Sequence, residues 1–197
     1  VLSIEHNINT ATEADEFYRT KLFLGTEGNL LHVTDARALP ENSNKGNTVM
    51  QYKYDMLGNL VYQNSMDAGQ RWLLTNILGN PLRTWDERNH EFQYFYDILH
   101  RPAHSKVMGG DGAVLLDHIF DKVFYGESLL SPGRSNESDL QAKNILGTVI
   151  RHFDTGGVID TPEYNFKGQP ISTTRRLFKK YKEVANWSDV NLEPVTL

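Results

Sequence analysis

The sequence predicts a mainly β fold of consecutive antiparallel hairpins that form a curved sheet, with one or two short helices. One observation is a motif that recurs every 21 residues, at Asp55, Asn76 and Asp97. A second is a turn signal about every ten or eleven residues, with aromatic and branched residues between the turns. A fixed period indicates a chain made from copies of one supersecondary unit, and here that unit is a β-hairpin.

The recurring motif is an Asp or Asn followed three residues later by Gly. Asp55 is followed by Gly58 and Asn76 by Gly79, while the copy at Asp97 has a histidine at the fourth position. A short Asp or Asn side chain can accept backbone N–H groups in a tight turn. Glycine supplies the positive φ that other residues resist. We therefore predict that these residues have a structural role at hairpin turns.

Two compressed copies of the motif follow near the C-terminal end of the chain. Asp154 and Gly157 form the first copy, and Asn165 and Gly168 form the second. Further turn signals lie at 67–70 and 86–89, between the main copies.

The segments between the turns have the composition of strands. Residues two apart share a sheet face, so we expect Tyr52 with Tyr54, and Tyr94 with Tyr96, to form a ladder on one side of the sheet.

The N-terminal part of the chain is less regular. Residues 1–8 alternate as a strand does, and 17–23 fit either a strand or a continuation of a helical turn. Residues 25–30 predict a degenerate first repeat. Residues 38–48, which include a proline and several polar residues, predict a surface loop.

After the central repeats we expect a turn at 107–112, a strand pair at 114–125 and a loop at 128–138. The spacing at 138–141 matches a capping box and predicts a short helix to about 146. An apolar stripe with basic residues mostly off it predicts an amphipathic helix at 172–185. Its apolar residues are Leu177, Phe178, Tyr181 and Val184, and its basic residues are Arg175, Arg176, Lys179, Lys180 and Lys182.

The motif at 54–60, Tyr-Asp-x-x-Gly-Asn-Leu, resembles the YD repeat of RHS-repeat proteins. Segments 66–72 and 79–86 resemble in particular the B component of bacterial insecticidal toxin complexes. Similar stretches recur at 125–127, 144–147, 151–154 and 163–168, so the resemblance covers most of the chain after about Phe23.

The resemblance implies that residues 1–197 are one YD-repeat segment of a much larger protein. Its expected function is that of a wall segment in a hollow shell, which encloses and shields a cytotoxic polypeptide until a translocation pore receives it. The implied partners are other YD repeats, a toxin C component or cargo, and a pore-forming A component. The implied location is outside the cell, or the cytoplasm before export.

Composition excludes several other functions. The net charge of −5 argues against nucleic acid as the main partner, because phosphate binding needs a basic surface. The absence of cysteine excludes disulfides and thiolate zinc sites. No apolar run is long enough for a membrane helix.

Candidate chemical sites have simpler structural explanations. His100 and His104 have a helical metal-ligand spacing, but Pro102 and the strand context remove that geometry. The glycines at 109–112 lack the lysine and helix of a phosphate loop. We therefore expect no metal and no cofactor.

Aspartates could provide acid and base catalysis, but nearly all of them occupy turn corners, where local hydrogen bonding explains them. These residues are Asp55, Asp67, Asp86, Asp97, Asp111 and Asp154. The family that the chain resembles has an aspartic self-cleavage activity in a downstream region, and no matching motif occurs here. We expect a protein that is not an enzyme.

An alternative function is a carbohydrate-binding or adhesion module. Trp72 and Trp85 could stack on sugar rings if they are exposed, whereas packing of sheet against sheet is the other explanation for them. The basic stripe at 175–182 could contact an acidic surface, although a solvated helix face is the simpler interpretation.

Overall fold

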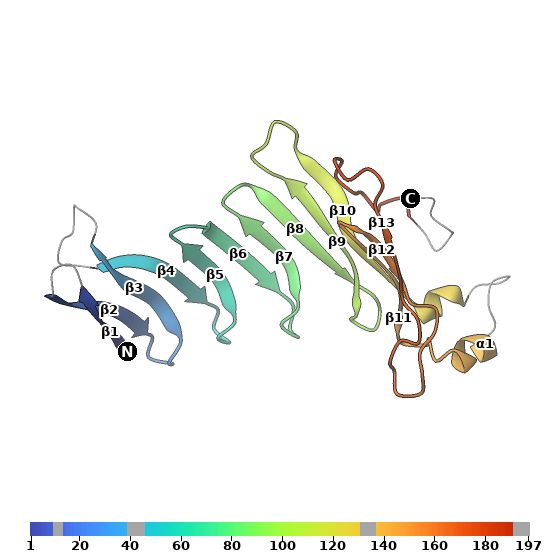
Figure 1. The fold of residues 1–197 in the computed structure, drawn as a ribbon, viewed down its shortest axis with the longest axis horizontal. Coiled ribbons are helices and arrows are strands. Elements are labelled where there is room, and N and C mark those ends of the chain that lie inside the picture. The colour runs from blue at the N-terminus through green and yellow to red at the C-terminus, as the bar shows by residue number, and fades with distance from the viewer. Residues whose placement is uncertain (10–13, 39–45, 131–136, 191–197) are drawn as a thin grey trace. The chain divides into compact units, whose positions relative to one another are not determined.

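The computed structural model of the chain describes residues 1–9, 14–38, 46–130 and 137–190. The chain divides into two compact units, Val1–Asn89 and His90–Leu197. Within each unit every strand pairs antiparallel with the next strand along the chain (Figure 1). The predicted fold class, mainly β and built from consecutive hairpins, is confirmed.

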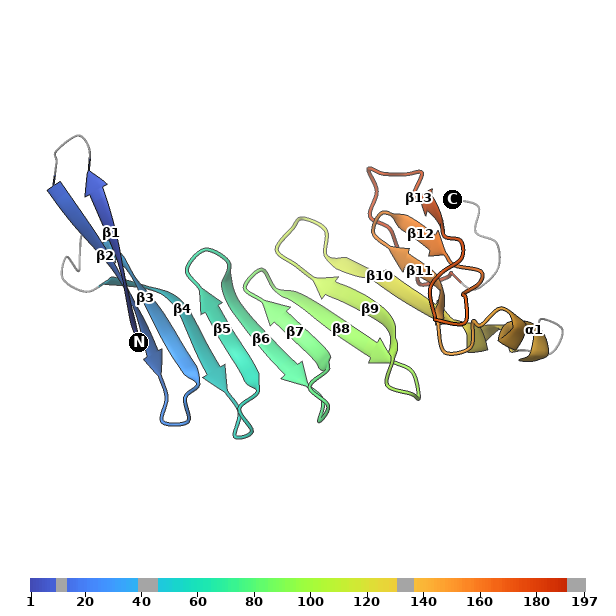
Figure 2. The same ribbon diagram turned by 60° about the horizontal axis from the view of Figure 1, so that its bottom comes forward.

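The first unit contains seven described strands in chain order. They are β1 (Leu2–Asn9), β2 (Ala14–Leu24), β3 (Leu30–Ala38), β4 (Gly46–Tyr54), β5 (Leu60–Ser65), β6 (Gly69–Thr75) and β7 (Pro81–Asp86). Because consecutive strands reverse direction, the turns after β2, β4 and β6 all lie at the same end of the strands, as Figure 2 shows. These three turns carry the degenerate copy at 25–30 and the copies at Asp55 and Asn76.

Each repeat hairpin has the same irregularity next to its turn. In the β4–β5 hairpin Lys53 pairs with Tyr62, but Tyr54 pairs with Leu60, so one residue of β5 is extra. The same shift precedes the turns after β2 and β6. A β-bulge of this kind increases the local twist of a hairpin, so the repeats share a backbone geometry as well as a sequence.

The second unit contains six described strands and two short helices. They are β8 (His90–Tyr96), β9 (Pro102–Gly109), β10 (Leu116–Tyr125), the 3₁₀ helix η1 (Gly126–Leu129), α1 (Glu137–Ala142), β11 (Val149–Asp154), β12 (Gly157–Asp160) and β13 (Thr174–Leu177). Neither helix has the length and apolar character that crossing a membrane requires.

The hydrophobic core lies in the second unit. One cluster of buried residues contains Phe153, Val158, Ala185 and Trp187, and a second contains Leu140, Ile145 and Ile150. In the described part of the first unit, Tyr62 is the one buried hydrophobic residue. The first unit is therefore a sheet without a covering layer of its own.

The predicted amphipathic helix at 172–185 is wrong. All of these residues are described, and they form strand β13 followed by turns. Arg175 forms an ion pair with Asp154, and Arg176 forms one with Asp160, while β13 completes the hydrogen bonding of β12. Of the apolar stripe, Phe178 packs on Trp187, and the other members are exposed. Tertiary pairing has overridden the helical period.

Three smaller predictions also need correction. The expected strand pair at 114–125 is the single strand β10. The helix expected to run to about 146 ends at Ala142, because a turn follows in which Asn144 has a positive φ. The expected loop at 38–48 is wrong at its ends, because Ala38 ends β3 and 46–48 begin β4, while 39–45 lie outside the described residues.

Candidate functional site

The copy of the motif at Asp55 forms a turn that is closed by its own side chain. One carboxylate oxygen of Asp55, Oδ1, accepts the backbone N–H groups of Leu57 and Asn59, both at 2.8 Å. The other, Oδ2, accepts the Asn59 amide at 2.9 Å. These hydrogen bonds, led by that from the Asn59 side chain, lower the pKa of Asp55. Gly58 takes a φ of 82° and donates its N–H to the Asp55 carbonyl.

The next two copies repeat this geometry. Asn76 Oδ1 accepts the N–H groups of Leu78 and Asn80 at 2.9 and 3.0 Å. Asp97 Oδ1 accepts those of Leu99 and Arg101, both at 2.9 Å. Gly79 has a φ of 81°, so it has the same conformation as the glycine of the preceding copy.

Arg101 adds a charged cluster to the third copy. Its Nε lies 2.7 Å from Asp97 Oδ2, and its Nη1 lies 3.4 Å from Glu127 Oε1. The guanidinium also lies 3.8 Å from the centroid of the Tyr125 ring. Burial acts to raise the pKa of Asp97, but the hydrogen bonds from Arg101 and Leu99 outweigh it and lower the pKa. The cluster joins the β8–β9 turn to η1.

The compressed copies are also turns. Asp154 Oδ1 accepts the Gly156 N–H at 2.8 Å, and Gly157 follows with a φ of 140°. Asn165 Oδ1 accepts the N–H groups of Lys167 and Gln169 at 2.9 and 3.0 Å, and Gly168 has a φ of 74°. All nine turn residues singled out in the sequence therefore lie in tight turns.

The two central residues of each main turn are large, apolar and exposed, a feature that the sequence analysis missed. Met56 is 100% exposed and Leu57 84%, and Ile77 is 99% exposed and Leu78 62%. The available signal was the apolar pair inside each Asp-x-x-Gly motif, which recurs as Ile98 and Leu99 in the second unit. We call Met56–Leu57 and Ile77–Leu78 the apolar turn pairs of the first unit.

A row of cross-strand partners crosses one face of the first unit. Lys53 pairs with Tyr62, Tyr62 with Trp72, and Trp72 with Trp85. The Tyr62 and Trp72 rings lie 4.4 Å apart, and the Lys53 ammonium lies 5.0 Å from the Tyr62 centroid. Trp72 is 46% exposed and Trp85 is half-buried. The structure thus brings the two tryptophans together and leaves one of them accessible.

The tyrosines expected to form a ladder are not part of this aromatic row. Tyr52 pairs with Gln63, on the other face of β4 from Lys53. Tyr52 and Tyr54 are half-buried, as are Tyr94 and Tyr96 in the second unit. Burial raises the pKa of Tyr96.

The residues considered for metal binding do not converge. His100 occupies the fourth turn position with a φ of 58°, and the His104 ring stacks on Phe95 at 4.3 Å. Burial lowers the pKa of His104. Within the ranges that the structure describes, no group of three or more histidine, aspartate or glutamate side chains could hold a metal ion.

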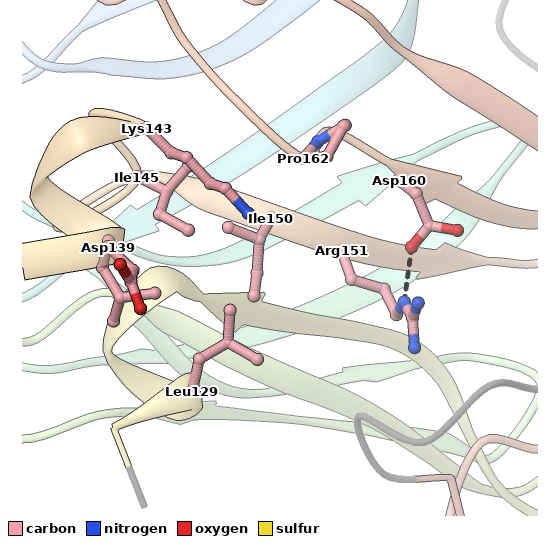
Figure 3. Close-up of a pocket in the computed structure, with 9 residues that line it drawn as sticks. Leu129, Asp139, Lys143, Ile145, Ile150, Arg151, Asp160 and Pro162 are labelled. Carbon is pink, nitrogen blue, oxygen red and sulfur yellow. Dashed lines mark hydrogen bonds and ion pairs between the residues drawn. The ribbon is translucent and has the colours of Figure 1, made fainter. Parts of the chain in front are cut away.

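A pocket of about 420 Å³ lies in the second unit between α1 and the β11–β12 hairpin (Figure 3). Its apolar lining comes from Leu129, Leu140, Ile145, Ile150 and Pro162, and its charged lining from Asp139, Lys143, Arg151 and Asp160. An ion pair joins Arg151 to Asp160, and Arg176 also contacts Asp160 at 2.7 Å. A lining of apolar side chains, with Arg151 and Asp160 paired beside them, could hold a small apolar group.

Comparison with known proteins relates the chain to a toxin subunit in sequence. No protein-family model matches the chain. The chain is 25% identical over 167 residues to the toxin subunit YenC2 of Yersinia entomophaga. This match covers 75% of the chain but 16% of the subunit, so the chain corresponds to a small part of that protein.

Several solved structures contain the same fold. Crystal structures of TcdB2-TccC3-TEV and of TcdB2-TccC3 without its hypervariable C-terminal region both match with a TM-score of 0.77 and 22% identity. Each match covers 97% of this chain and 9% of the other. The Photorhabdus luminescens Tc holotoxin pore matches with a TM-score of 0.76 and 22% identity, over 97% of this chain and 8% of that one.

The matched structures cover almost the whole chain, so the likeness in fold extends over both units. The chain is thus similar in sequence to a toxin subunit and similar in fold to the TcdB2-TccC3 structures.

Proposed function

We propose that the chain is a structural wall segment of an RHS/YD-repeat shell that encloses and shields a cytotoxic polypeptide. The observation that carries the proposal is the first unit, in which hairpins closed by their own turn side chains form a sheet that buries little by itself. Such a sheet is suited to forming a wall, because it gains stability from neighbouring repeats rather than from a central core.

The proposal assigns no catalytic step to this segment. The aspartates that could act as acids lie at separate turns, where Asp55, Asp97 and Asp154 are occupied by backbone N–H groups. The proposed partners are other YD repeats of the same protein, a toxin C component or its cargo, and a pore-forming A component. The proposed location is that of a secreted toxin complex.

The natural protein that contains this segment tests the proposal. It would be purified with an antibody against residues 1–197, weighed by mass spectrometry, and digested with a protease before and after denaturation. We expect a product of many hundreds of residues that contains a polypeptide protected until denaturation. A product that ends near Leu197, or one whose parts are all digested at the same rate, would contradict the shell.

The aromatic row supports a second candidate, a carbohydrate-binding surface. Trp72 is accessible, and a row of amides lies beside it on the same face, because Gln51 pairs with Asn64 and Asn64 with Gln70. Aromatic faces and planar amides are complementary to the apolar faces and hydroxyl groups of sugar rings. Soluble oligosaccharides should then quench tryptophan fluorescence in the native chain and not in Trp72→Ala. Equal fluorescence changes in both proteins would exclude this site.

A further inference from the structure

A segment without regular secondary structure closes the core of the second unit. It consists of residues 185–190, which follow β13 and which we call the strap. Ala185 and Trp187 are 5% and 2% exposed, and the Trp187 ring packs on Phe153 and Phe178. The strap therefore covers one of the two buried clusters of this unit.

The strap lies beside a part of β10 that β11 does not reach. β11 pairs with β10 over 122–125, and the pairing of β9 with β10 shifts between Ile119 and Asp121. At this irregularity the Ile119 carbonyl accepts the Trp187 N–H at 3.0 Å, and the Ile119 N–H donates to Asn186 Oδ1 at 3.2 Å. Two hydrogen bonds thus hold the strap to β10 where the pairing with β11 ends.

A half-buried lysine on β10 holds the rest of the strap. Lys122 Nζ donates to the Trp187 carbonyl at 3.3 Å and to the Val190 carbonyl at 2.7 Å. Burial lowers the pKa of Lys122, and the charge of Asp189 in the strap acts in the opposite direction. Because hydrogen bonds from a charged donor are stronger than those between neutral groups, the closed strap depends on this ammonium group.

The same lysine belongs to a row of cross-strand partners on one face of the sheet. Phe95 pairs with His104, His104 with Lys122, and Lys122 with Phe153. The Cβ atoms of such partners lie about 5 Å apart. The His104 ring stacks on Phe95 at 4.3 Å, which fixes its position beside Lys122. Burial, and then the charge of Lys122, lower the pKa of His104.

We propose that His104 and Lys122 form an acid-sensitive latch for the strap. At neutral pH His104 is uncharged, and the Lys122 ammonium holds the strap closed. Protonation of His104 in mild acid places a second positive charge beside Lys122, and the two charges repel. Opening of the strap relieves this repulsion, because it lets water reach both groups. Every contact of the latch lies within the second unit, so the latch does not depend on the proposed shell.

The direction of the effect follows from proton binding. The pKa of His104 in the closed state lies below the ordinary value of about 6.5, so the closed state binds fewer protons than the open state. The contribution of uncharged His104 to closure is fully present above about pH 6.5, and it is lost as pH falls through the pKa of His104 in the closed state.

The other charged groups around the row are members of ion pairs. These pairs are Lys106–Asp117, Asp97–Arg101 and Arg151–Asp160. His152 precedes Phe153 by one residue, so it lies on the opposite face of β11, where it contacts Asp121 at 2.7 Å. His152 is therefore a matched histidine outside the row.

Hydrogen exchange of the Trp187 backbone amide in the full chain, followed by NMR, tests the latch. Its protection factor compares the observed rate with the intrinsic rate at the same pH. We expect the protection factor to fall several-fold between about pH 7.5 and about pH 5 in the native chain, and to stay constant in His104→Gln. His152→Gln is the control and should keep the native fall.

Three results would overturn the latch. They are a protection factor that does not change with pH in the native chain, a fall that persists in His104→Gln, and a fall that disappears in His152→Gln. Lys122→Gln provides a second variant. It should lower the protection of Trp187 at both pH values and remove the pH dependence, because the charge that His104 repels is absent. A pH dependence retained in Lys122→Gln would also contradict the proposal.

Discussion

The residue at the fourth turn position is selected by its backbone conformation. Gly58 and Gly79 have φ values of 82° and 81°, where an added Cβ is strained even though no backbone atom crowds it. His100 occupies the same position with a φ of 58°, within the small left-handed region that histidine, asparagine and aspartate tolerate better than most residues. The repeat therefore constrains φ more strictly than residue identity.

Replacing either of these glycines with alanine should slightly lower the free energy of unfolding. We expect Gly58→Ala and Gly79→Ala each to lower the free energy of unfolding by about 1 kcal/mol, because the strain of a positive φ exceeds the gain from a stiffer unfolded chain. Urea unfolding of the full chain measures the change. Gly25→Ala is the matched control, since its Cβ would meet Leu31 Cδ2 at 3.6 Å, an ordinary contact, without a positive φ. A loss as large in the control would contradict the explanation.

Hydrogen bonding of the turn carboxylates makes stability depend on acid pH. The pKa of Asp97 is lowered in the folded chain, so its contribution to stability is present above the unfolded pKa of about 3.9 and is lost as pH falls through the folded pKa. Asp97→Asn should keep the turn, as Asn76 does, and flatten the decline of stability below about pH 4. Urea midpoints from pH 6 to pH 2.5 measure this slope. An unchanged slope would show that the carboxylate is not responsible.

At the scale of elements, hairpins could be predicted from the sequence because their determinants are local. Asp55 with Gly58, and Asn76 with Gly79, specify a turn within four residues, and the alternating strands follow on either side. The segment 172–185 could not be predicted in this way. Its strand pairs with β12 and forms ion pairs with Asp154 and Asp160, and these contacts lie 16 to 21 residues away in the sequence.

The candidate surfaces were likewise predictable only where their determinants are local in the sequence. The turn residues could be recognised from the repeat. Trp72 and Trp85 could be recognised as aromatic residues, but their position in one row depends on the register of β5, β6 and β7. The apolar turn pairs were visible in the sequence, yet apolar residues are normally expected inside a protein. Their exposure follows from the tight turn, which projects both side chains away from the sheet.

The segment after β13 is an element without regular secondary structure that completes the core. Trp187 is 2% exposed, and its Nε1 donates to the Asp154 carbonyl at 3.1 Å. Its ring packs on Phe153 at 5.0 Å and on Phe178 at 5.6 Å. Lys122 Nζ donates to the Val190 carbonyl at 2.7 Å and holds the end of the segment.

Replacement of this tryptophan should be far more costly than replacement of the exposed one. We expect Trp187→Ala to lower the free energy of unfolding of the second unit by about 3 to 5 kcal/mol, because it leaves a large cavity and removes the hydrogen bond to the Asp154 carbonyl. Trp72→Ala, at a position that is 46% exposed, is the control and should cost clearly less. Urea unfolding followed by circular dichroism compares the two. Similar losses would mean that this segment does not close the core.

At the scale of the whole molecule, the two units differ in how they are stabilised. The second unit has two buried clusters and long-range ion pairs. The first unit relies on strand hydrogen bonds and turn side chains, with Tyr62 as its one buried hydrophobic residue among those described. Because apolar burial is the dominant favourable term in folding, the isolated chain should not unfold as a single cooperative unit.

Hydrogen exchange should therefore separate the two units. We expect amides of β4 to β7 to exchange through openings of lower free energy than amides of β10 and β11, whose side chains contact Phe153 and its neighbours. Exchange followed by mass spectrometry on the full chain measures both sets under one condition. Equal protection of both units would show that the first sheet is stable without neighbours and would remove the physical reason for assigning it to a wall of repeats.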